Sequence, residues 1–365
     1  MTLSLYFARR FLLNFLAVFG VFLTFMFMVD MVEQLRKFAA NDVGVQQAAL
    51  LAALNVPQNI YRILPLLTIL ATLALFVAVA RSSELVVVRA GGRSALYTLL
   101  APILTALMLG VFAVAVLNPI VAATSRRYEA MADRFSGSDA SILSIDQEGL
   151  WLRQSGADRQ TVIRALRANL DGTQLFNVTF LEFGQDGGIM RRIEAATALL
   201  APGAWHLDQV KIWRFIPGTN PEADAQFQDS LSLPSDLTVD QIRESFGTPS
   251  AISIWNLPKF IDQLSRSGFS ARQYRMWFQR ELALPAMMAA MVLVGAAFTM
   301  RHARFGKTGV KVLMALLAGF SLFFLRNLSQ VLGENGNIPV VLAAWSPPLA
   351  ATLLALGLLL HLEDG

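Results

Sequence analysis

The chain has 365 residues, of which 55% are hydrophobic and only 15% are charged, and its formal net charge is +4. Soluble domains are about a quarter charged, so this composition and a mean hydropathy of +0.51 exclude an ordinary water-soluble fold. The absence of cysteine excludes disulfides, thiolate metal sites and cysteine nucleophiles.

Six apolar runs are long enough to cross a bilayer, which takes about 20 residues. The first run leads into Asp30 rather than a small-x-small cleavage site, which predicts an uncleaved span instead of a signal peptide. The predicted spans cover residues 11–29, 63–80, 95–118, 282–300, 312–332 and 337–360.

Basic residues predict the orientation of these spans, because they gather in short cytoplasmic loops. With the N-terminus inside, the outer loops hold only Arg36, Lys37 and Arg62. The cytoplasmic segments then hold nine basic residues: Arg9, Arg10, Arg81, Arg89, Arg93, Arg301, Arg304, Lys307 and Lys311. Both ends of the chain are therefore expected in the cytoplasm.

About 150 residues between the third and fourth spans differ in composition. Five runs with strand chemistry, such as TVIRALRA and LFNVTFLEFG, are separated by Gly, Asp and Pro turn residues, which predicts an extracytoplasmic β-sandwich or roll. Two helical segments, VDQIRESF and LPKFIDQLSRSG, follow. The expected division is spans one to three with a cytoplasmic helix at about 82–92 in residues 1–125, this domain in 126–270, and spans four to six in 271–365.

The charged stretch RSSELVVVRAGGR, residues 81–93, separates two long apolar runs. Ser82 and Gly91 are good helix ends, and Glu84 in the first turn suits the helix dipole. Two interpretations remain open, a turn with a solvated carboxylate or a short helix that docks into a soluble partner.

Four cations lie toward the outer ends of the predicted spans: Arg36, Lys37, Arg62 and Arg326. An ionisable residue inside a span, such as Arg326, is a functional candidate, and the group suits an anionic headgroup, especially phosphate. The alternatives are snorkelling to the interface and, for Arg326, pairing with Glu334 or a backbone carbonyl.

No enzyme motif is complete. FGKTG, residues 305–309, has Arg301 where a phosphate-binding loop needs its first glycine, so no ATP site is expected in this chain. The three histidines are far apart and suggest no metal or catalytic site, and nothing predicts nucleic-acid binding.

SSELVVVRAGG resembles the coupling-helix motif Ser-Glu-Leu-x-x-x-x-Ala-x-Gly of the lipopolysaccharide-export ABC transporter permeases, the LptF/LptG family. VDMVEQLRKF, at the end of the first span, looks like the LptG branch, with the sister LptF branch as the alternative. LPKFIDQLSRSGFSARQYRMWFQRELALP resembles the segment that enters the fourth span of these proteins. Asp30 departs from the family, whose members carry a basic residue there.

The resemblance implies six transmembrane helices in two three-helix halves, with an inserted periplasmic β-jellyroll-like domain, in a bacterial inner membrane. It implies a sister permease, two copies of a cytoplasmic ATPase (LptB) and the periplasmic bridge proteins LptC and LptA as partners. ATP is then used by the partner ATPase, and this chain binds no cofactor directly. The implied function is to extract lipopolysaccharide from the inner membrane. A membrane-anchored periplasmic scaffold or chaperone is the alternative, for which Glu84 and Arg326 are dispensable.

The resemblance also suggests roles for individual residues. ATPase coupling is expected at Glu84, Leu85, Arg89 and Gly91. Headgroup contacts are implied at Arg36 and Lys37, whereas those expected at Arg62 and Arg326 rest on their charge and position, since Arg326 has no basic equivalent in the family. The alternation of Phe176, Val178 and Phe180 predicts an apolar face for the acyl chains, although a plain sandwich core has the same pattern.

Overall fold

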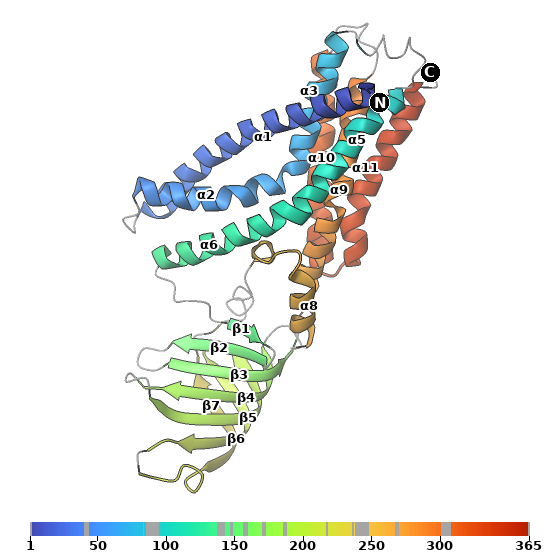
Figure 1. Cartoon of the computed structure of the whole chain (residues 1–365). Helices are drawn as coiled ribbons and strands as arrows, with labels where there is room; N and C mark the ends of the chain where they lie inside the picture. Colours follow the sequence, from blue (N-terminus) through green and yellow to red (C-terminus); the bar gives the residue numbers. More distant parts are fainter. Residues whose placement is uncertain are drawn as a thin grey trace. The chain divides into compact units, whose positions relative to one another are not determined.

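The chain folds into two compact units in the computed structural model (Figure 1). The helical unit comprises Met1–Ser136, Ser250–Trp255 and Arg272–Gly365, and the sheet unit comprises Gly137–Pro249 and Asn256–Ala271. The structure describes residues 2–39, 44–82, 84, 95–136, 143–146, 149–155, 160–169, 173–184, 188–216, 218–235, 237, 248–266, 270–300 and 308–363.

The described part of the helical unit contains five helices that are long and apolar enough to cross a membrane, and a bent pair that supplies a sixth span. The single helices are α1 (Thr2–Lys37), α9 (Arg272–Thr299), α10 (Thr308–Glu334), α11 (Val340–Glu363), and α5 (Ala95–Phe112) continued by a π-helical turn (Ala113–Leu117) and α6 (Asn118–Ser136). The six predicted spans are therefore confirmed as helices.

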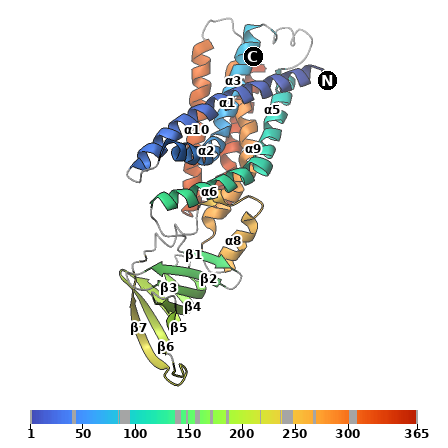
Figure 2. The ribbon, with the colours of Figure 1, turned by 60° about the vertical axis from the view of Figure 1, so that its left-hand side comes forward.

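Helix α9 forms the centre of this unit, since it contacts α3, α5, α10 and α11 (Figures 1 and 2). Small residues allow these close approaches. A Cβ at Gly110 of α5 would lie 2.5 Å from the Cα of Pro285 in α9, and one at Gly295 would lie 2.9 Å from Thr72. The apolar core of the unit is therefore built around α9.

The sequence prediction missed helix α2 (Val45–Arg62), which was expected to be an outer loop. Interspersed polar residues lower its hydropathy, but Ala48, Ala52, Val56 and Ile60, spaced four residues apart, form one buried stripe, as in an amphipathic helix. Helix α3 (Leu64–Arg81) follows after a break at Ile63, and the two helices meet at a bend of 65°. This bend places Arg62 inside a broken span.

The described strands of the sheet unit form one antiparallel seven-stranded sheet in which each strand pairs with the next along the chain. This sheet is the inserted β-rich domain that the sequence predicted, and its described strands belong to a single sheet. The strands are β1 (Leu143–Asp146), β2 (Gly149–Ser155), β3 (Gln160–Ala168), β4 (Gln174–Phe183), β5 (Ile189–Ala201), β6 (Ala204–Arg214) and β7 (Gln226–Pro234).

Strands β1 to β6 coincide with the predicted runs, whereas β7 was missed because most of its residues are exposed and polar. Helix α8 (Leu257–Arg266) confirms one predicted helical segment, and the other, at 239–246, lies outside the described residues. Positive φ angles at Asn177 in β4 and Gln209 in β6 interrupt the strict alternation of these strands.

Candidate functional site

The first candidate site lies where α3 ends and the charged stretch begins. Ser82 closes the helix, because its backbone N–H and its Oγ both donate to the carbonyl oxygen of Ala78 at 3.1 Å. The Ser82 hydroxyl also lies 2.7 Å from Oε1 of Glu84. The predicted N-cap residue thus orients the carboxylate two positions further on.

The Glu84 carboxylate is held by the first span. Arg10 Nη1 donates to both carboxylate oxygens, at 2.9 and 2.8 Å, and the Tyr6 hydroxyl donates at 3.2 Å. Partial burial alone would raise the pKa of Glu84, but the hydrogen bonds from Ser82 and Arg10 and the charge of Arg10 outweigh it and hold the pKa below its usual range. Glu84 is therefore an anion at neutral pH that joins α1 to the segment after α3.

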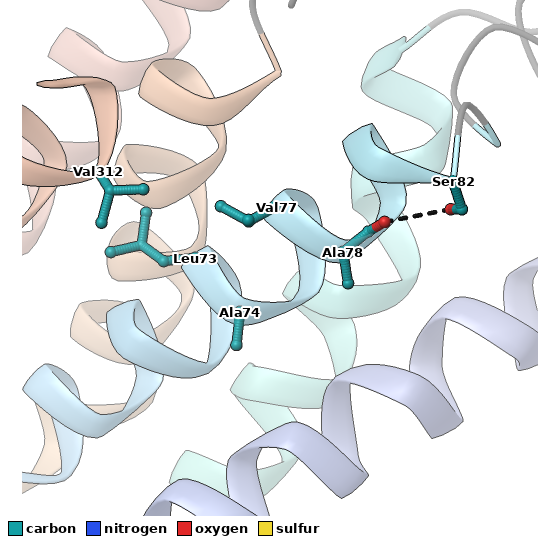
Figure 3. A pocket seen from close by; sticks show the side chains of 6 residues that line it. All are labelled: Leu73, Ala74, Val77, Ala78, Ser82 and Val312. Atoms are coloured by element: carbon teal, nitrogen blue, oxygen red, sulfur yellow. Dashed lines mark hydrogen bonds between the residues drawn. The ribbon is translucent and has the colours of Figure 1, made fainter. Parts of the chain in front are cut away.

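An apolar groove of about 690 Å³ borders this ion pair. Figure 3 shows Leu73 and Val77 of α3 opposite Val312 of α10, with Ser82 at the end of the groove. The other coupling residues predicted from the sequence, Leu85, Arg89 and Gly91, lie outside the described residues.

The four predicted headgroup cations fall into two pairs near opposite ends of α2. Arg36 and Lys37 end α1, and the neighbouring Phe38 packs with Leu51 near the start of α2, whereas Arg62 ends α2. From Leu51 to Arg62 the helix rises about 16 Å. We expected all four cations at the same depth in the membrane because the sequence did not indicate helix α2.

The first pair lies beside a polar contact between α1, α2 and α6. Asp30 is only 3% exposed and accepts a hydrogen bond of 2.7 Å from Asn55, and Gln34 accepts one of 3.2 Å from Tyr128. The Lys37 ammonium lies 6.0 Å from the centre of the Tyr128 ring. Asp30 therefore helps to join α1 to α2, and Lys37 lies over an aromatic ring beside this contact.

The second pair is in direct contact, since Arg326 Nη2 donates to the backbone carbonyl of Arg62 at 3.3 Å. Of the two structural partners considered for Arg326, the structure shows the backbone carbonyl. Glu334 instead accepts a hydrogen bond from Gln330.

Sequence reasoning missed the buried Glu281 at the start of the fourth span, which is 2% exposed. Its carboxylate accepts hydrogen bonds from Tyr61 and, at 3.2 Å, from Asn118. Asn118 also accepts the backbone N–H of Ile254 at 2.8 Å. In the sequence, Glu281 follows Arg280 directly before an apolar run, where charged residues usually mark the end of a span. Its burial could therefore not be predicted from the sequence.

The predicted apolar face of β4 is partly correct. Val178 and Phe180 are each 1% exposed, but Phe176 is only half-buried and Leu175 is fully buried. The positive φ of Asn177 changes the alternation at this point, so Leu175 takes the place expected for Phe176.

Together these features define a multi-pass membrane protein with a sheet domain inserted between its third and fourth spans. The family profile described as "Lipopolysaccharide export system permease LptF/LptG" matches residues 5–361. The chain belongs to this family.

Two relatives bear the name lipopolysaccharide export system permease protein LptG. The Escherichia coli K12 protein is 26% identical over 339 residues, which cover 91% of each chain. The Haemophilus influenzae protein is 25% identical over 342 residues, which cover 92% of each chain. This chain is therefore a multi-pass inner-membrane permease component of the lipopolysaccharide export system.

Proposed function

We propose that the chain is the LptG-type subunit of the exporter, which pairs with a sister LptF-type permease and is driven by two copies of a cytoplasmic LptB-type ATPase. In this proposal both termini are cytoplasmic and the sheet domain is periplasmic, where it passes lipopolysaccharide to a bridge of LptC and LptA type. The names of the relatives and the distribution of basic residues support this assignment.

The observation that carries the proposal is the set of hydrogen bonds from Arg10 and Tyr6 to Glu84. Helix α1 is continuous over 36 residues, a length of about 54 Å, and it ends at Arg36 and Lys37. A force applied by the ATPase to the segment around Glu84 would thus reach α1 directly, and α1 would carry it to the cations at its other end.

The lipid requires an apolar route, because exposing its acyl chains to water costs about 0.8 kcal/mol per CH₂. Exposed aromatic side chains on α1 and α10, among them Phe25, Phe320 and Phe324, are suited to line it inside the membrane. Arg36 and Lys37 are suited to bind the phosphates. In the sheet, Val178 and Phe180 belong to the apolar face that is suited to receive the chains.

The test is recovery of the ATPase with this chain from membranes in which both permeases and the ATPase are co-expressed. Glu84→Gln removes the charge with little change in volume, and we expect it to reduce ATPase recovery relative to recovery of the sister permease. Full ATPase recovery with Glu84→Gln would contradict the coupling role, and no recovery with the wild-type chain would favour an anchored scaffold.

Glu222→Gln is the matched control. Glu222 is also a paired carboxylate, since Lys211 and Trp213 donate hydrogen bonds to it. These bonds lower its pKa, but Glu222 lies in the sheet unit. We expect this variant to recover the ATPase as the wild type does.

A further inference from the structure

Three arginines from three different helices meet near the bend between α2 and α3. Arg62 ends α2, Arg280 belongs to α9 and Arg326 to α10. The Arg326 guanidinium touches the Arg62 carbonyl. Arg280 lies beside Glu281, which accepts a hydrogen bond from Tyr61, the residue before Arg62. Like charges gathered in an apolar environment need a counter-charge.

One counter-charge is Glu281, but its hydrogen-bonding capacity is largely used. One oxygen accepts from Tyr61 and Asn118, and the other lies 3.8 Å from Nη2 of Arg280. Glu281 therefore neutralises Arg280 first.

The other nearby carboxylate, Glu334, accepts a hydrogen bond of 2.7 Å from Gln330. Gln330 in turn accepts one from Arg280, whose guanidinium also lies 4.0 Å from the centre of the Trp277 ring. Among the described residues, Glu281 and Glu334 thus both serve Arg280, and the exposed Arg62 side chain is solvated, which leaves the buried Arg326 without a carboxylate of its own.

The uncompensated charge is best assigned to Arg326. This side chain is 7% exposed, and its Nε is buried without a hydrogen-bond acceptor. Among the described residues, no carboxylate lies within 4.0 Å of its guanidinium. Buried polar groups almost always have partners, so an unused donor on a buried cation points to a ligand that is not part of this chain.

The location suits a ligand from the lipid headgroup region. Arg280 lies eight residues after the start of α9 and Arg326 eight residues before the end of α10, so each is about 12 Å from its helix end. The Arg62 side chain is exposed, so the cluster extends from the surface inward. The N-terminus of α3 at Leu64 adds the positive end of a helix dipole.

We propose that Arg62, Arg280 and Arg326 form a binding site for a phosphate group, separate from the pair Arg36 and Lys37. A phosphate offers several acceptor oxygens, which match the forked donors of arginine, and it would supply the missing negative charge. The same chemistry fits a lipid headgroup phosphate or free inorganic phosphate. The lipid as the source rests on the proposed function.

The test compares full-length wild type with Arg326→Gln and Arg326→Lys in lipid nanodiscs. The probes are lipopolysaccharide, chemically dephosphorylated lipopolysaccharide and inorganic phosphate, and affinity is obtained from the ligand-dependent rise in Tm. Arg214→Gln, at an exposed position of β6, is the control. The transition measured without ligand shows that each variant is folded.

We expect wild type and Arg214→Gln to bind the phosphorylated lipid more tightly than the dephosphorylated one. Arg326→Gln should weaken the phosphate-dependent binding about tenfold or more, and Arg326→Lys, which keeps the charge, about threefold. Protection by inorganic phosphate that disappears in Arg326→Gln, with lipid binding unchanged, would support the site with free phosphate as its ligand.

Equal phosphate dependence in wild type and Arg326→Gln, for the lipid and for inorganic phosphate, would overturn the site. This result would leave the proposed function intact, since lipid binding itself would remain. If the wild type bound neither form of the lipid, the proposed function would fail instead, and inorganic phosphate alone would decide whether the site exists.

Discussion

The ion pair between Arg10 and Glu84 can be tested by exchanging its two charges. Arg10→Glu alone and Glu84→Arg alone each place like charges together, whereas the double variant restores an opposite pair with reversed direction. A contact that acts only inside the chain should be restored by this exchange. A contact that Glu84 also makes with a basic residue of the ATPase should not be restored.

The expected size of the intrachain effect follows from the geometry. One nitrogen, Nη1 of Arg10, contacts both oxygens of Glu84, and the side chains are 27% and 32% exposed, so solvent screens the pair. We expect it to contribute about 1 kcal/mol, between an exposed ion pair and a buried charged hydrogen bond. Each single variant should therefore lower Tm by about 1–3 °C.

The pH dependence of this effect has a definite sign. Because the pKa of Glu84 is lowered in the folded chain, the stabilisation is complete above the usual glutamate pKa of about 4.3. It is lost as the pH falls through the folded-state pKa. The difference in Tm between wild type and Arg10→Gln should disappear in acid and be constant near neutral pH.

Two measurements on the same samples distinguish the roles of the pair. We expect the double exchange to return Tm to within about 1 °C of the wild type while ATPase recovery stays low. The neighbouring variant Arg9→Gln, at an exposed position, is the control for charge removal. If the double exchange restored ATPase recovery, or if Arg10→Gln and Arg9→Gln had the same Tm, the reasoning would be refuted.

Three further predictions concern packing and backbone geometry. Gly110→Val should lower Tm and membrane levels because its side chain would meet Pro285, whereas Gly20→Ala, with no atom within 4 Å of its Cβ, should be neutral. Asn118→Ala leaves buried partners unpaired and should destabilise the helical unit by about 1–3 kcal/mol, measured as a lower midpoint in denaturant. Asn177→Val should destabilise the sheet unit by about 1–2 kcal/mol because of the positive φ, whereas Asn177→Gly should be tolerated; local hydrogen exchange would report both.

The sequence was sufficient for the parts of the fold that depend on long apolar runs or regular punctuation. The predicted spans and strands β1 to β6 follow from hydropathy and turn residues. Helix α2 was missed because an amphipathic helix at a membrane has no continuous apolar run. Strand β7 was missed because Asp229 interrupts the alternation of Phe227, Leu231 and Leu233 with polar residues, and most of the strand is exposed.

The sites show a similar limit. Glu84 could be selected from its position in the loop, but its partner Arg10 is 74 residues away in the chain. Arg10 was used only to predict the orientation of the spans. The bend between α2 and α3 brings Arg62 to Arg326, although the two are 264 residues apart. Pairings between distant helices depend on helix rotation, which hydropathy does not define.

The most direct test of the account is ATP-dependent release of lipopolysaccharide from proteoliposomes that contain this chain, the sister permease and the ATPase. We expect release to a soluble periplasmic acceptor only with ATP, and loss of this release in Glu84→Gln although the lipid still binds. Release that does not depend on ATP, or that continues unchanged in Glu84→Gln, would contradict the claim that Glu84 couples the ATPase to the lipid-carrying helices.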